Sequence, residues 1–176
     1  MVRQQTRTTC AHGFTLIELM MVVMILGIVG ALAAPMFSST DSDQLKAAAR
    51  LIAADLAFAQ IESISHGDDL CVAVFDATDH KYHLAKASDT TIPIKNPADQ
   101  KDYVVEFGKG RAGTLSGVQI HAHSFDDDDE LSFGLYGQLD ETLDQSITLT
   151  KNGLYLKIWV DANSGEVEIN PVTSTP

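Results

Sequence analysis

Residues 13–37 read GFTLIELMMVVMILGIVGALAAPMF, and this stretch decides how the rest of the chain is organised. From residue 19 to residue 37 it holds nineteen consecutive residues without a charged or strongly polar side chain. A helix that crosses a bilayer needs about 20 predominantly apolar residues. We therefore predict a hydrophobic transmembrane helix over residues 14–37, followed by a polar domain.

Glu18 is an acidic residue inside this apolar stretch. A carboxylate costs on the order of 2.5–3.5 kcal/mol at the centre of a membrane helix and less near the interface, so it predicts a functional site with a cationic partner. No Lys or Arg follows Glu18 until Lys46. Cleavage between Gly13 and Phe14 would supply the missing cation as the new α-amino group of Phe14. A carboxylate near a helix N-terminus also gains from the helix dipole.

A basic segment ahead of an apolar run is also typical of a secretory signal peptide. Arg3 and Arg7 precede the run, and Ala31-Leu32-Ala33 forms a small-residue cleavage pattern. The run is longer than the apolar region of a usual signal peptide, and such a signal gives Glu18 no role. A secreted or membrane-tethered binding domain or enzyme, cleaved near Ala33 or not at all, stays an alternative.

The stretch resembles the prepilin-type N-terminal cleavage and methylation motif of type IV pilins and type II secretion pseudopilins. The resemblance implies that a prepilin peptidase cuts after Gly13 and methylates the new N-terminus at Phe14. It implies that Glu18, fifth in the mature chain, neutralises the amino terminus of a neighbouring subunit and sets subunit register. It also implies a kink or melted stretch at Pro35. The expected parts are a leader (1–13), an apolar membrane and assembly helix (14–37) and a periplasmic domain (38–176).

Elementary physics supports these assembly roles. Two charges buried in lipid or in a filament core must pair, and a pair between subunits fixes their axial register. Pro35 lacks an amide hydrogen and clashes with the preceding turn, which predicts a kink or break. Close approach of neighbouring helices is permitted by five small residues, Gly27, Gly30, Ala31, Ala33 and Ala34.

Apolar residues recur at helical spacing from Leu45 to Ala59, which predicts an amphipathic helix that ends near His66. Gly67 is then expected as the C′ residue. Since one face of this helix is apolar, a domain must pack on it. Strands are predicted over residues 70–75, 82–87, 103–107, 118–124, 131–133, 146–150, 154–160 and 166–169. The predicted fold class is α+β: a long N-terminal helix, its first half transmembrane, with an antiparallel sheet packed on its second half, as in pilins.

Segments of the body add to the resemblance. LKAAARLIAADLAFAQIESISHGDDLCVAVFD (45–76) is similar to the helix and first strand of GspH/FimT-like minor pseudopilins. SFGLYGQLDETLDQSITL (132–149) and LKIWVDANSGEVEI (156–169) resemble their closing strands, with an F-x-x-x-G turn and a late hairpin. The resemblance implies a minor pseudopilin that assembles into, or initiates, the periplasmic pseudopilus of a type II secretion system. A minor pilin of a type IV pilus is the alternative, serving adhesion, motility or pilus assembly.

The charge distribution limits the partners. The formal net charge is −12, and removal of the leader with its two arginines makes it −14. Binding to a phosphate backbone needs clustered Lys and Arg, so nucleic acid is not an expected partner. The expected partners are a prepilin peptidase, other pseudopilins or pilins contacted through the N-terminal helix, and the bacterial inner membrane. The protein is expected to cross that membrane once, with its globular domain in the periplasm.

Other candidate sites are weak. Cys10 lies in the expected leader, and Cys71, within LCVAVF, is predicted to be a buried core residue. Consecutive carboxylates such as residues 126–130 rarely converge on one ion, so a solvated loop is favoured over a calcium site. Residues 161–165 are interpreted as a turn, and the two close His pairs (80 and 83, 121 and 123) lack the further ligands of a zinc site. We predict no catalytic set, no metal site, no cofactor and no enzymatic activity.

Overall fold

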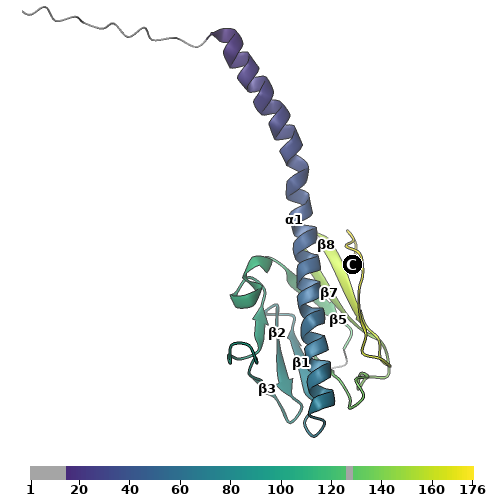
Figure 1. Ribbon diagram of the computed structural model, residues 1–176. Coiled ribbons are helices and arrows are strands. Elements are labelled where there is room, and N and C mark those ends of the chain that lie inside the picture. The colour runs from purple at the N-terminus through teal and green to yellow at the C-terminus, as the bar shows by residue number, and fades with distance from the viewer. Residues whose placement is uncertain (1–14, 126–128) are drawn as a thin grey trace, which may run out of the picture. The chain divides into compact units, whose positions relative to one another are not determined.

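The computed structural model describes residues 15–125 and 129–176, with the side chains of residues 30–39 excepted. The chain divides into two units, Met1–Ser38 and Ser39–Pro176. The first element is the helix α1, Leu16–Ser65, which contributes to both units (Figure 1). The predicted helix is therefore present, and it ends one residue before the predicted end.

In the first unit, α1 presents apolar side chains on all sides. Its large apolar residues between Leu16 and Val29 have exposed fractions of 43–78%. In the part of the chain that the structure describes, no helix is both long and apolar enough to cross a membrane. The predicted transmembrane segment 14–37 includes Phe14 and the side chains of residues 30–37, which lie outside that part.

The second unit has two antiparallel sheets where the sequence predicted one. The first sheet has the strand order β3-β2-β1-β6, and β4 pairs with the same edge of β2 as β3 does. The second sheet has the order β5-β7-β8-β9. The strands of the first sheet are β1 (Cys71–Asp76), β2 (Lys81–Lys86), β3 (Asp89–Pro93), β4 (Val104–Glu106) and β6 (Glu130–Ser132). Those of the second are β5 (Gln119–His123), β7 (Gln145–Lys151), β8 (Leu154–Val160) and β9 (Val167–Ile169).

Both sheets pack on one core together with the second half of α1, which lies across them in Figure 1. The helix contributes the residues at the predicted spacing, and they are fully or almost fully buried: Leu45, Ala48, Ile52, Leu56 and Ala59. The 3-10 segment η1 (Gly110–Leu115) adds Ala112 and Leu115 to the same core. Each Å² of apolar area buried in this contact stabilises the domain by about 25 cal/mol.

Two local predictions have different outcomes. The turn at Lys151-Asn152-Gly153 is confirmed: Asn152 and Gly153 have φ of 50° and 78°, as a tight hairpin between β7 and β8 requires. Gly67 follows the end of α1 as predicted, but it is absent from the described glycines with positive φ and so lacks the left-handed conformation typical of a C′ glycine. A Cβ on Gly67 would lie 2.3 Å from Cδ2 of Leu135, a side chain that is 52% exposed and would have to shift.

Candidate functional site

The start of α1 carries the predicted assembly residue, Glu18. The Glu18 amide donates hydrogen bonds to the backbone oxygen of Thr15 (3.1 Å) and to its hydroxyl oxygen (3.3 Å). Thr15 is therefore the N-cap of the helix, because its side chain satisfies an amide that the first turn leaves unpaired. This role was not predicted from the sequence, although Thr15-x-x-Glu18 is the pattern of a capping box.

Glu18 lies exposed among exposed apolar side chains. Within the described residues it forms no salt bridge with a Lys, Arg or His side chain. Gly13 and Phe14, where cleavage and methylation are predicted, lie outside the described residues. Pro35 is part of α1, but its side chain is not among those described. The Phe14–Glu18 pairing and the Pro35 kink thus stay predictions.

A buried polar cluster fixes the second half of α1 to the first sheet. The Asp55 carboxylate, on the buried side of the helix, accepts hydrogen bonds from the hydroxyls of Tyr82 (2.6 Å) and Tyr103 (2.9 Å). Arg111, in η1, pairs with the same carboxylate and places its guanidinium 4.7 Å from the centroid of the Tyr103 ring. Burial, with the Asp55 charge as the next cause, raises the pKa of Tyr82 well above its ordinary value. Three elements are thereby joined at one carboxylate.

A second polar contact holds the C-terminal end of α1 to two turns of the domain. The Gln60 amide donates to the backbone oxygens of Gly137 (2.7 Å) and Ser164 (3.0 Å), which belong to two separate turns. These turns touch closely, since a Cβ on Gly165 would lie 2.2 Å from the Gly137 oxygen. Gly137 and Gly165 also have positive φ, of 85° and 67°, a conformation that favours glycine. A side chain at either position would in addition crowd its neighbours, since a Cβ on Gly137 would lie 3.0 Å from Nε2 of Gln60.

The ammonium group of Lys151 ties the start of the domain to the second sheet. Lys151 is buried, and its Nζ atom is satisfied by hydrogen bonds that it donates to the Ser116 backbone oxygen (2.7 Å) and to the side chain of Gln44. It also lies 3.4 Å from an Asp41 oxygen, while Asn152 donates to the other Asp41 oxygen (2.8 Å). The pKa of Asp41 is accordingly lowered, first by its hydrogen bond from Asn152. The helix is therefore held to the domain along its whole second half.

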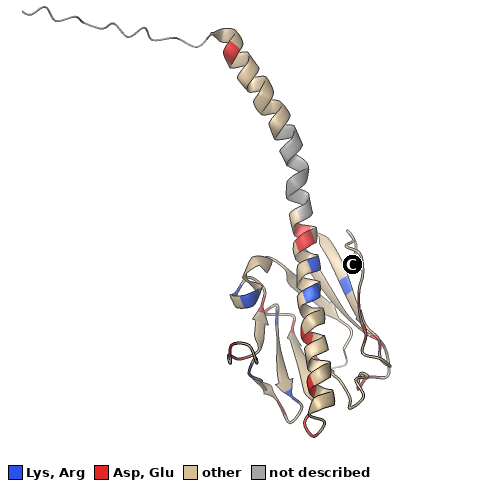
Figure 2. Ribbon diagram, in the orientation of Figure 1, with Lys and Arg blue, Asp and Glu red and all other residues tan. Residues whose placement is uncertain are grey.

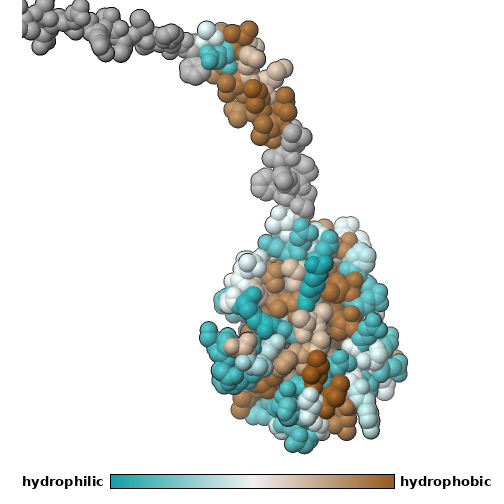
Figure 3. All heavy atoms as spheres, in the orientation of Figure 1, coloured by the Kyte–Doolittle hydropathy of each residue, from teal (hydrophilic) through white to brown (hydrophobic). Residues whose placement is uncertain are grey.

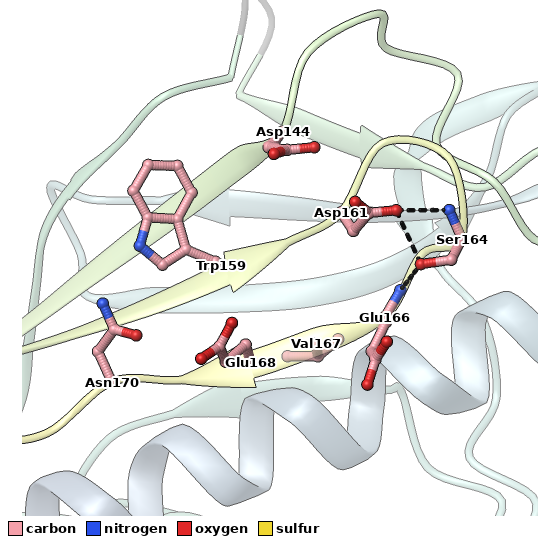
Figure 4. A pocket seen from close by; sticks show the side chains of 8 residues that line it. All are labelled: Asp144, Trp159, Asp161, Ser164, Glu166, Val167, Glu168 and Asn170. Carbon is pink, nitrogen blue, oxygen red and sulfur yellow. Dashed lines mark hydrogen bonds between the residues drawn. The ribbon is translucent and has the colours of Figure 1, made fainter.

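An open pocket of about 630 Å³ lies at β8 and β9 (Figure 4). Its walls include Trp159, Asn170 and four acidic residues, Asp144, Asp161, Glu166 and Glu168. The Asp161 carboxylate accepts from the Ser164 hydroxyl (2.8 Å), which is the first cause of its lowered pKa, and from two backbone amides of the turn. Asp144 accepts from the Ala162 amide (2.9 Å). Both aspartates thus stabilise the 161–165 turn, and the turn itself is present as predicted.

The remaining candidates lie apart from one another. Cys71 is fully buried as predicted, and burial raises the pKa of its thiol to about 11, so it is not a reactive thiol at neutral pH. His83 contacts the Thr90 backbone oxygen (2.8 Å), whereas His123 lies 3.1 Å from Asp129. Residues 126–128 of the acidic run are outside the described residues. Over the described ranges, no group of three or more His, Cys, Asp or Glu is placed to hold a metal ion.

Both the sequence motif and the fold of this chain have known counterparts. Residues 9–34 match the prokaryotic N-terminal methylation motif. No curated protein matches the sequence. The type IV minor pilin FimU of Pseudomonas aeruginosa is similar in structure, with a TM-score of 0.53, 15% identity and coverage of 75% of this chain and 92% of FimU.

The minor pseudopilin EpsH of the Type 2 Secretion System of Vibrio cholerae is similar to almost the same degree. Its TM-score is 0.52 at 13% identity, and the match covers 73% of this chain and 97% of EpsH. At these identities the likeness concerns the fold. The chain thus combines a prokaryotic N-terminal methylation motif with an α+β, pilin-like fold.

Proposed function

We propose that this chain is a minor pseudopilin of a type II secretion system, which assembles into or initiates the periplasmic pseudopilus that drives protein export. The observation that carries the proposal is the methylation motif at residues 9–34 at the head of a helix whose second half bears a pilin-like domain. In this role the chain is a structural subunit and the substrate of a prepilin peptidase, with no enzymatic activity of its own.

The proposed assembly begins in the bacterial inner membrane. The leader, residues 1–13, is removed between Gly13 and Phe14, and Phe14 is methylated. Residues 14–37 hold the chain in the membrane with residues 38–176 in the periplasm. The exposed apolar side chains of residues 16–29 then exchange lipid for the equivalent helices of other subunits, and Glu18 pairs with the amino terminus of a neighbour. The kink or melted stretch is proposed at Pro35, within residues 14–37.

A minor pilin of a type IV pilus is the second candidate. The structural similarity to FimU, which equals that to EpsH within 0.01 in TM-score, is the observation that favours it. Both candidates use the same processing and the same helix. They differ in the set of subunits that the helix contacts.

Photo-crosslinking from the apolar helix separates the two. A photoreactive amino acid replaces Met24, which is 71% exposed, in the full chain in its native membrane, and crosslinked partners are identified by mass spectrometry. The matched control carries the probe at Leu143, which is 73% exposed but lies in the periplasmic domain. Pseudopilins captured from Met24 support the proposal, and pilus subunits support the second candidate. The absence of any pilin-like partner would contradict both.

A further inference from the structure

The outer face of β8 and β9 forms a wall of the open pocket. Trp159 is 36% exposed on this face, while its two neighbours along β8 are buried in the core, as the alternation of a strand requires. Trp159 lies opposite Glu168 of β9, and Asn170 lies beside Lys157, whose backbone oxygen accepts from the Asn170 amide (2.9 Å). Figure 4 shows the side chains of Trp159, Glu168 and Asn170 gathered beside these two strands. An indole ring and polar side chains thus line the same surface.

The aromatic wall of the pocket already holds a cation. Nζ of Lys157 lies 4.5 Å from the centroid of the Trp159 ring. The negative face of an indole ring attracts positive charge, and arginine makes such contacts more often than lysine. No acidic side chain in the described ranges forms a salt bridge with Lys157, so the indole is the group that attracts its ammonium. The chain's own lysine therefore identifies a cation as the group that this wall accepts.

The carboxylates of the pocket supply a surplus of negative charge. Two of the four, Asp144 and Asp161, already accept hydrogen bonds from the turn that joins β8 to β9. The other two, Glu166 and Glu168, are exposed and form no salt bridge within the part of the chain that the structure describes. Figure 2 shows acidic residues in the chain around this turn. A positive group on the aromatic wall would therefore find carboxylates that have no cation of their own.

A second, smaller hollow continues the pocket along the same face. It has a volume of about 200 Å³ and shares Asn170 with the acidic pocket. Its walls include Tyr155, Lys157 and Pro171. Tyr155 and Trp159 are four residues apart on β8, which corresponds to about 13 Å at the rise of a strand. The two hollows together form a groove that suits about four residues of extended polypeptide and is longer than a small cation.

We propose that this groove binds an extended basic segment of a partner protein, with an arginine of the segment in the acidic pocket and a small apolar side chain in the second hollow. A guanidinium group is planar, so it stacks on the Trp159 ring while it donates two hydrogen bonds to the carboxylate of Glu168. A lysine offers only a point charge there. The ammonium of Lys157 leaves the ring when the guanidinium arrives, and Lys157 is thus a competitor built into the site.

This surface differs from the apolar regions of the molecule. Figure 3 shows the strongest hydrophobic colour on the front of the domain over the last turns of α1. The groove instead combines an exposed indole with charged groups, which gives it a defined ligand chemistry. The inference goes beyond the proposed function, since neither the leader nor the apolar helix takes part in it.

Fluorescence of Trp159 tests the groove directly, because Trp159 is the only tryptophan of the chain. The full chain in detergent is titrated with a capped serine–glycine peptide that carries one arginine and, four positions away on each side, a valine. A matched peptide has citrulline, which keeps the shape of arginine without its charge. N-acetylarginine amide represents the arginine side chain alone.

The arginine peptide is expected to change the emission and to reach half-saturation at a several-fold lower concentration than either control compound. The same half-saturating concentration for the citrulline peptide would overturn the cation as the ligand group. The same concentration for N-acetylarginine amide would overturn the extended segment. An unchanged emission with the arginine peptide would overturn the groove as its site.

Two variants of the groove give opposite expectations by the same readout. Glu168→Gln removes the proposed partner of the guanidinium and should raise the half-saturating concentration several-fold, whereas Lys157→Gln removes the competitor and should lower it. Asp68→Asn, the same change of charge at an exposed acid outside the pocket, is the control and should leave it unchanged. Wild-type binding by Glu168→Gln, or weaker binding by Lys157→Gln, would overturn the proposed site. Crosslinking from Met24 tests the proposed function separately.

Discussion

The hydroxyl of Tyr82, on β2, donates a hydrogen bond of 2.6 Å to the buried carboxylate of Asp55 on α1. Tyr103 and Arg111 complete the surroundings of that carboxylate. Apolar packing alone would allow the helix to slide or rotate on the sheet, whereas this set of directional contacts specifies one position. Asp55 is therefore one of the residues that fix the helix to the domain, together with Gln60 and Lys151.

Replacement of Asp55 is therefore expected to destabilise the domain strongly. Asp55→Ala leaves two buried tyrosine hydroxyls and a partly buried guanidinium without their partner, a loss of about 3 kcal/mol in the free energy of unfolding. Urea unfolding of the detergent-solubilised chain measures it. Asp68→Ala, an exposed acid after the helix, is the control and should change the stability by less than about 0.5 kcal/mol. Equal effects of the two variants would refute a special role for Asp55.

The decrease of stability at high pH should depend on the ionisation of the Tyr82 hydroxyl. Burial raises its pKa above the ordinary value of about 10, so above that pH the unfolded chain releases a proton that the folded chain retains. The contribution of Tyr82 to stability is then fully present below about pH 10 and falls as the pH rises further. Tyr103, whose pKa is also raised, adds to this loss above about pH 10, and Cys71, whose pKa rises from 9.0 to about 11, adds a loss that begins near pH 9. The Tyr82→Phe variant should show a shallower decline of the urea midpoint between pH 9 and about pH 11; an unchanged slope would contradict the burial argument.

Gly165 and Gly153 form a matched pair of glycines. Both have positive φ, of 67° and 78°, but only at Gly165 would a Cβ collide with backbone, at 2.2 Å from the Gly137 oxygen. Gly153 has open space at the same position. Each alanine variant incurs the backbone strain, and Gly165→Ala should lose about 2 kcal/mol more because the turns must separate. Thermal unfolding of both variants measures the difference. Similar melting temperatures would show that the two turns separate at little cost, which would contradict the expected steric effect at Gly165.

Glu18 should matter for assembly and not for processing. Glu18→Ala removes the proposed partner of the Phe14 amine while leaving the Gly13–Phe14 bond intact. We expect the leader to be removed largely as in the wild type, with a marked decrease in crosslinking from Met24 to other subunits. Glu18→Gln, which keeps the size and removes the charge, should behave like the alanine variant. Wild-type assembly of either variant would refute the charge-pairing role.

The elements that could be predicted are those whose determinants are local in sequence. The 3.6-residue spacing from Leu45 to Ala59 located the packed half of α1, and alternation located β8 at its observed bounds. The missed strand was β3, Asp89–Pro93, which is mostly exposed and ends in proline, so it carries no apolar pattern. The division into two sheets was also missed, because pairing between strands depends on contacts that are distant in sequence.

The functional residues also fall into those that local sequence predicts and those that it does not. Glu18 and the cleavage position follow from a charge within an apolar run and from the motif around it. The Asp55–Arg111 pair joins residues 56 positions apart, and Gln60 reaches turns 77 and 104 positions away. No spacing rule connects such residues. Thr15 is the residue that could have been found, since Thr-x-x-Glu at the start of an apolar helix is a capping signal.

The central claim is that the N-terminal stretch is processed as a prepilin leader. Mass spectrometry of the N-terminal peptide of the chain, purified from its native inner membrane, tests it most directly. The account predicts a mature chain that begins at Phe14 and carries one additional methyl group on its amino terminus. A chain that begins after Ala33, or that keeps residues 1–13, would contradict it.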